Sequence, residues 1–220
     1  MIRQISNMDQ LIVSLGTTSA RLMELLYSFD PEAINEAPRK GAWTAAQVAD
    51  HITRSNTSIA KALALAGTTI NRDPGERIDE LRAIFLDFSI RFKSPDFILP
   101  TQEVYKKNMV IRVLEDSIKI VDEMARQGDL SEMITHPAFG DITKFEILHF
   151  VLYHTQRHIH QLENIKEVIQ NKPGKQLQAG STARVEIFKT NIEEPYQAKQ
   201  IIESLLQHFP GNRVPGSAHC

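Results

Sequence analysis

Apolar residues recur every three or four positions along four long stretches of the chain, and this period sets the class of fold. The stretches cover residues 5–29, 44–66, 102–127 and 144–171. A period of three to four residues places the apolar side chains on one face of an amphipathic helix. Because each such face has to be buried, we expect the helices to pack as an antiparallel four-helix bundle, an all-α fold.

Capping signals predict where two of these helices begin. Thr44 is followed by Gln47, and Thr143 is followed by Glu146, each at the three-residue spacing of a capping box. A shorter amphipathic stretch at residues 77–92 lies between the second and third long stretches. It predicts an extra helix inside the long connection between the second and third bundle helices.

The chain changes character after the fourth long stretch, which suggests how it is organised. Residues 1–172 are expected to form the bundle, and nothing there alternates clearly enough to predict a sheet. Residues 173–183, which include Pro173, Gly174 and Gly180, are typical of a linker. Residues 184–220 begin with a β-like segment followed by a helical one, so we expect a short strand-helix tail that resembles an incomplete α/β unit.

Charge and cysteine usage exclude several classes of function. The formal net charge is -2 and no helix carries a basic stripe, so we expect neither nucleic acid nor a membrane surface as a partner. We see no secretory signal and no apolar run long enough to span a bilayer, so the expected location is cytoplasmic. Cys220 is the single cysteine, and therefore any metal has to be held by nitrogen and oxygen.

Two histidines of the fourth long stretch lie on its apolar face. His154 and His158 are four residues apart, one helical turn, whereas His149 and His160 are rotated away from this face. A lone inward histidine is usually a core imidazole hydrogen-bonded to a neighbour. For two stacked imidazoles that explanation is weaker, because each unmet polar group costs about 1–3 kcal/mol, and a shared metal ion removes that cost.

A third histidine can complete such a site. His51 lies on the apolar face of the second stretch, so a bundle can bring it to His154 and His158. Three histidines leave a fourth position open for water or substrate, which is typical of a catalytic rather than a structural metal site. Thr155 stands where a zinc protease of the H-E-x-x-H type has its glutamate, so that class is disfavoured.

Three more residues are candidate catalytic groups, each with an ordinary alternative. Gln161 can hydrogen-bond a ligand or substrate, or be a solvated glutamine on the helix flank. Tyr153 can act as a phenolic donor, although packing is the commoner role for such a residue. His136 can approach the open face of the metal, or serve only as a loop cap or surface residue.

Three segments resemble the DinB-like superfamily in order and spacing. They are "GAWTAAQVADHITRSN", "HPAFGDIT" and "YHTQRHIHQL", and the resemblance extends over roughly residues 5–170. Proteins of this type are four-helix bundles, often dimeric, with a divalent metal, nickel or zinc, held by three histidines. The resemblance implies that His51, His154 and His158 are the metal ligands and that the chain forms a homodimer.

The resemblance also suggests a range of chemistry. Some relatives are transferases that join the thiols bacillithiol, mycothiol or glutathione to an electrophile, and others are isomerases that depend on such a thiol. We therefore expect a metal-dependent S-transferase or hydrolase that uses a metal-bound thiolate or water on a small-molecule electrophile, with a low-molecular-weight thiol as cosubstrate. The alternative is a non-catalytic bundle whose metal is structural or sensory.

Overall fold

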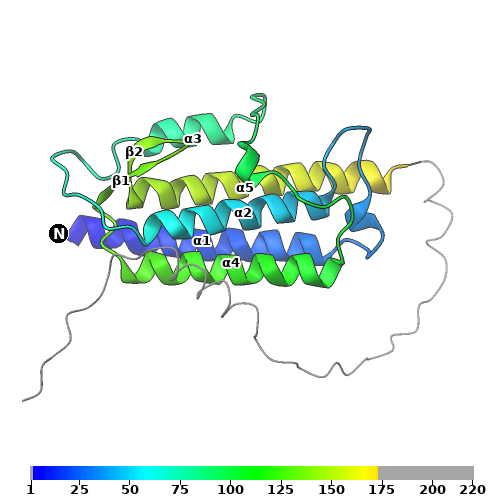
Figure 1. Ribbon diagram of the computed structural model, residues 1–220, viewed down its shortest axis with the longest axis horizontal. Helices are drawn as coiled ribbons and strands as arrows, with labels where there is room; N and C mark the ends of the chain where they lie inside the picture. Colours follow the sequence, from blue (N-terminus) through cyan, green and yellow to red (C-terminus); the bar gives the residue numbers. More distant parts are fainter. Residues whose placement is uncertain (1, 173–220) are drawn as a thin grey trace, which may run out of the picture. The chain divides into compact units, whose positions relative to one another are not determined.

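A computed structural model describes residues 2–172, with side chains from residue 8 onward, and these residues form the expected four-helix bundle (Figure 1). The long helices are α1 (Ile2–Tyr27), α2 (Ala45–Leu63), α4 (Lys107–Gln127) and α5 (Lys144–Gln170). The shorter elements are η1 (Ala33–Asn35), α3 (Ile78–Leu86), η2 (Asp96–Ile98), β1 (Met133–His136) and β2 (Gly140–Thr143). The predicted linker, residues 173–183, and the predicted tail, residues 184–220, lie outside the described residues. No helix within residues 2–172 has both the length and the apolarity needed to cross a membrane.

The four long helices form two pairs, α1 with α5 and α2 with α4. The two helices of a pair are parallel, and the two pairs run in opposite directions. Helix α1 packs against α4 and α5, and α2 packs against the same two helices. Arg21 of α1 bonds to Glu163 of α5, and Ser28, just after α1, bonds to Lys166 further along α5, so α1 and α5 run in the same direction. Helices α2 and α4 run the opposite way (Figure 1). The long connection from α2 to α4, which contains α3, allows these two helices to be parallel.

Both predicted capping boxes are present. The Thr44 hydroxyl accepts from the backbone N–H of Gln47, and the Gln47 side chain accepts from the backbone N–H of Thr44. Thr143 and Glu146 make the same reciprocal pair at the start of α5. Each box satisfies backbone donors that have no partner within the helix, and this sets where α2 and α5 begin.

The extra helix and the region before α5 differ from the sequence-based expectation. Helix α3 is shorter than predicted and ends at Leu86, with Asp87 in an extended conformation. Strands β1 and β2, which we did not predict, are four residues long each and form an antiparallel hairpin next to α5. Gly140, at φ 63°, adopts the left-handed conformation that the tight turn of the hairpin requires.

A polar layer crosses the middle of the bundle between two apolar clusters. On α5, residues 147–153 belong to one cluster and residues 159–169 to the other, and His154 and His158 lie between them. On α4, Ser117 occupies the same level and accepts a hydrogen bond from Asn56 of α2 at 3.1 Å. His154 and His158 therefore lie at a level where the apolar core is interrupted.

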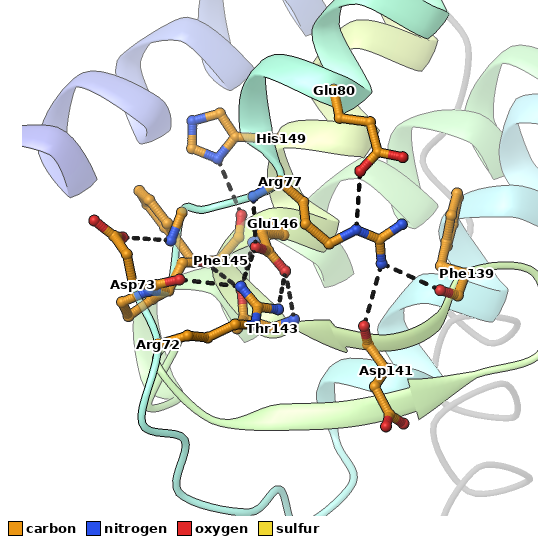
Figure 2. A network of polar contacts seen from close by, with 12 residues as sticks. Arg72, Asp73, Arg77, Glu80, Phe139, Asp141, Thr143, Phe145, Glu146 and His149 are labelled. Atoms are coloured by element: carbon orange, nitrogen blue, oxygen red, sulfur yellow. Dashed lines mark hydrogen bonds and ion pairs between the residues drawn. The ribbon is translucent and has the colours of Figure 1, made fainter.

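A buried carboxylate holds together the elements around the start of α5 (Figure 2). Glu146 is fully buried and accepts two hydrogen bonds from Arg72, at 2.5 and 2.7 Å. It also accepts from the backbone N–H groups of Arg77 and Thr143, at 2.9 and 3.0 Å. The Arg77 guanidinium then donates to the carbonyl of Phe139 in the hairpin turn. This network ties the segment before α3 and the hairpin to the first turn of α5.

Candidate metal centre

Three histidine side chains from two helices converge on one point. His51 comes from the second turn of α2, and His154 and His158 come from successive turns of α5. The Nε2 atom of His154 lies 3.2 Å from that of His51 and 2.9 Å from that of His158. The candidate ligand atoms of the three residues all lie within 4.8 Å of one another. The structure therefore brings together the three residues that the sequence proposed as metal ligands.

The opposite ring nitrogens of two histidines are held by acceptors. His51 Nδ1 lies 2.9 Å from the backbone oxygen of Ile98 in η2, and His158 Nδ1 lies 2.8 Å from Gln161 Oε1. An oxygen of this kind only accepts, so each Nδ1 carries the proton and each Nε2 presents a lone pair.

With these tautomers, the Nε2 atoms of His51 and His158 both need a hydrogen-bond donor, and His154 can supply only one. His154 Nε2 can carry at most one proton, so it can donate to His51 or to His158 but not to both. A cation satisfies all three lone pairs at once. Ligand nitrogens roughly 2.0–2.1 Å from a tetrahedral metal are about 3.3 Å apart, close to the observed spacings. The residues present therefore fit a divalent metal ion.

Burial keeps the three imidazoles neutral. It lowers the pKa of His158 to about 3 and that of His154 well below its ordinary value, and the neighbouring histidines reinforce both shifts. Burial also lowers the pKa of His51. Since a neutral imidazole is the form that binds a metal ion, the surroundings favour the binding form at neutral pH.

The three histidines form part of the wall of a large pocket. Its volume is about 1090 Å³, which is large enough for a drug-sized molecule. The rings of Phe85 and Phe150 lie 6.2 and 5.0 Å from the ring of His154, and the Trp43 ring lies 5.0 Å from that of His51. The histidines are thus accessible from a mostly apolar cavity and are not sealed within the core.

An arginine next to the histidines shapes one side of this pocket. Arg157 donates hydrogen bonds to the backbone oxygens of Phe85, Asp87 and Ile90, and its guanidinium lies 4.7 Å over the ring of Phe92. These contacts hold the segment after α3 against α5. Because the carbonyls at 87 and 90 accept from Arg157, the segment follows an irregular path, which explains why α3 is shorter than its apolar period predicted.

The other candidate residues have different positions. Gln161 contacts a candidate ligand, as one of its two expected roles required. His136 is buried in the pocket wall, where its Nδ1 accepts from the N–H of Ala138 and its Nε2 has no partner among the described residues. Tyr153 does not line this pocket and packs near His149, so packing is the role that the structure supports.

The two remaining histidines of α5 lie off the triad, as their rotation predicted. His149 contacts the backbone oxygen of Phe145 at 3.0 Å. His160 stacks on Phe88 with ring centroids 4.2 Å apart, and it lines the pocket without joining the triad.

Sequence reasoning missed two contributors to the site. Ile98 acts through its backbone oxygen, so its side chain gave no signal, and it lies in a stretch that reads only as loop. Arg157 lies three residues after His154, and this spacing could have placed it beside the site.

Comparison with known proteins identifies related sequences and folds. A family model described as the DinB superfamily matches residues 14–162, a range that contains all three histidines. The uncharacterised protein YuaE of Bacillus subtilis strain 168 is 22% identical over 149 residues, which are 66% of this chain and 90% of YuaE.

Two solved structures are also similar. The four-helix bundle protein TT2238 is 21% identical with a TM-score of 0.48, over 71% of this chain and 98% of that chain. YfiT from Bacillus subtilis, described as a probable metal-dependent hydrolase with an unusual four-helix bundle topology, is 17% identical with a TM-score of 0.48. The match covers 73% of this chain and 86% of YfiT.

Proposed function

Since this chain belongs to the DinB superfamily, we propose that it is a metal-dependent enzyme. In this proposal His51, His154 and His158 hold a divalent cation, nickel or zinc. The observation that carries the proposal is the convergence of three Nε2 atoms in the wall of an open pocket, while acceptors hold two of the Nδ1 atoms. A structural metal needs no such access, because its ligand shell is closed.

The protein residues position the site and control its surroundings. A divalent cation on three neutral imidazoles keeps its full charge, so it lowers the pKa of a thiol or water that occupies its open position. Ile98 and Gln161 fix the orientation of two ligand rings. Phe85 and Phe150 keep the surroundings of His154 apolar, which strengthens electrostatic interactions at the site.

The reaction we propose is attack by a thiol, or by water, on a small electrophile. Among the described residues that line the pocket, none is an aspartate or a glutamate. Outside the triad, the general bases that the described wall offers are His136 and His160 rather than a carboxylate, which favours a nucleophile that loses its proton readily. A thiol, with an ordinary pKa near 8.5, does so far more easily than water. This favours thiol transfer as the first candidate and hydrolysis as the second.

One assay distinguishes the candidates. Metal-loaded protein is incubated with a panel of electrophiles, with and without glutathione, bacillithiol or mycothiol, and both thiol loss and electrophile loss are followed. Thiol-dependent loss of both indicates S-transfer, and loss of the electrophile alone indicates hydrolysis. No turnover with any pair, together with a metal that exchanges no ligand with solvent, would favour the structural or sensory alternative.

We also propose that the protein is a homodimer, as its family resemblance implies. Light scattering on the purified full chain is the direct check. A monomeric mass at micromolar concentration would contradict the proposal.

A further inference from the structure

The charged side chains in the pocket wall are all of one sign. Four cationic residues line the pocket, and no carboxylate among the described residues does so; the cations are Arg39, Arg91, Lys93 and Arg157. The chain as a whole has a formal net charge of -2. The described pocket wall therefore carries a net positive charge in a chain whose net charge is negative.

Three of these cations are available to a ligand. Arg39, Arg91 and Lys93 are exposed, and within residues 8–172 none of them forms an ion pair. Other arginines are paired with carboxylates, as Arg72 is with Glu146 and Arg126 with Asp122. These three cations thus have no counterion among the residues that the structure describes.

The fourth cation has a structural role. Arg157 donates to three backbone oxygens and also feels the charge of Asp87. The Asp87 carboxylate accepts hydrogen bonds from Ser89, at 2.6 and 2.9 Å, and it is not part of the pocket wall. Asp87 is therefore engaged with Ser89 and Arg157 and forms no ion pair with Arg91 or Lys93.

Large apolar side chains alternate with these cations along the same segment. Phe88, Phe92 and Phe97 line the pocket, and each is about half exposed, at 47%, 47% and 50%. Exposed aromatic rings around a cavity are costly in water and are stabilised when a ligand covers them. The segment thus offers an apolar surface and a positive charge within a few residues of each other.

We propose that the pocket binds an amphipathic organic anion, with an apolar body against these rings and an acidic group at Arg91 and Lys93. This inference rests on the proposed function, for which it names the substrate class. The anionic group interacts with the pocket cations, and the apolar body reaches toward the three histidines. A neutral molecule of the same shape gains only the apolar contacts and binds more weakly.

Two fluorescent probes of nearly the same shape test the proposal. Anilinonaphthalene sulfonate carries one negative charge, and N-phenylnaphthylamine has the same aromatic frame without it. Trp43, the only tryptophan in the chain, lines the pocket, so a bound probe quenches its emission. Titrations of the full-length protein, without metal and after loading with zinc, give the dissociation constant of each probe.

Charge reversal identifies the cations responsible. We expect the sulfonate to bind about tenfold more tightly than the neutral probe, and Arg91→Glu with Lys93→Glu to remove that preference. The neutral probe should bind within about twofold of its wild-type affinity. The matched control is Lys106→Glu with Arg112→Glu, two exposed cations outside the pocket that change the net charge equally.

Two results would overturn the inference: equal binding of both probes by the wild type, or equal loss of sulfonate binding in the pocket variant and in the control. Metal content, measured on the same samples, keeps the two proposals apart. If the protein prefers the sulfonate but takes up no metal, the result contradicts the proposed enzyme and still supports the anion site. A protein that binds metal without this preference contradicts the anion site alone.

Discussion

The Nε2 atoms of His154 and His158 lie 2.9 Å apart, one helical turn from each other on the buried face of α5. Two lone pairs cannot face each other at this distance without a proton or a cation between them. The proton of His158 is on Nδ1, which donates a hydrogen bond to Gln161 Oε1. This pair, completed by His51, is the basis for the predictions that follow.

Replacing Gln161 should weaken metal binding without abolishing it. Gln161→Leu removes the acceptor that orients His158, and losses of this kind typically weaken metal affinity about 10–100-fold. Gln161→Glu keeps an acceptor and should retain affinity. Competition against a zinc-binding dye gives the dissociation constants. The control is Asn164→Leu, one turn further along and bonded to His160, so equal losses in both leucine variants would contradict the role of Gln161.

Zinc should stabilise the folded protein through the triad. At a free zinc concentration one hundred times the dissociation constant, binding only to the folded state adds about 2.7 kcal/mol to the free energy of unfolding. The Tm of the wild type should therefore rise by several degrees, and that of His51→Ala should not change. A zinc-induced rise of the same size in the variant would show that the metal binds elsewhere.

Loosening the segment after α3 should change its dynamics more than global stability. Arg157→Met keeps much of the side-chain bulk but removes the hydrogen bonds to the backbone oxygens of Phe85, Asp87 and Ile90. We expect amide hydrogen exchange of residues 85–92 to speed up by at least about tenfold, because local opening loses contacts made by a charged donor. Unchanged exchange in this segment would contradict the positioning role of Arg157.

The buried carboxylate of Glu146 should make stability depend on acid pH. Burial raises the pKa of Glu146, but hydrogen bonds from Arg72, Thr143 and Arg77 outweigh it, and the folded-state pKa is lowered. A lowered pKa contributes stability that is complete above the unfolded value, about 4.3, and is lost as the pH falls through the folded value.

Glu146→Gln should therefore cost about 2–3 kcal/mol at pH 7, since Arg72 loses its partner but stays partly solvated. It should also flatten the loss of stability below about pH 4.3. Chemical denaturation at a series of pH values measures both effects. Glu80→Gln, in an exposed pair with Arg77, is the control, and an equal effect there would contradict the account.

Side-chain signals predicted the start of two helices closely, and weaker signals placed other boundaries less well. Thr44 and Thr143 carry capping boxes, so the starts of α2 and α5 were predicted to within a residue. Helix α4 begins at Lys107 and not near residue 102. The earlier start was predicted because Val104 continues the apolar period, but the side chain of Val104 is 70% exposed. Lys106, at the N-cap of α4, makes no side-chain cap that the sequence could have signalled.

Some contacts of the site could not be predicted from side-chain patterns because they are made by backbone atoms. The helical period placed His51, His154 and His158 on buried faces, and the bundle then brought them together. The acceptor for His51 is the carbonyl of Ile98, whose position depends on the path of a long connection. The hairpin, with strands of four residues, is too short for alternation to reveal.

The most direct test of the metal centre is elemental analysis of protein purified without a histidine tag. The account predicts about one nickel or zinc ion per chain in the wild type. It predicts a fall to below about a tenth of that in His51→Ala and His154→Ala, because two remaining ligands bind a divalent ion far more weakly. His149→Ala, a non-ligand histidine of the same helix, should keep the full metal content. Full metal content in both ligand variants, with their helicity intact by circular dichroism, would contradict the three-histidine site.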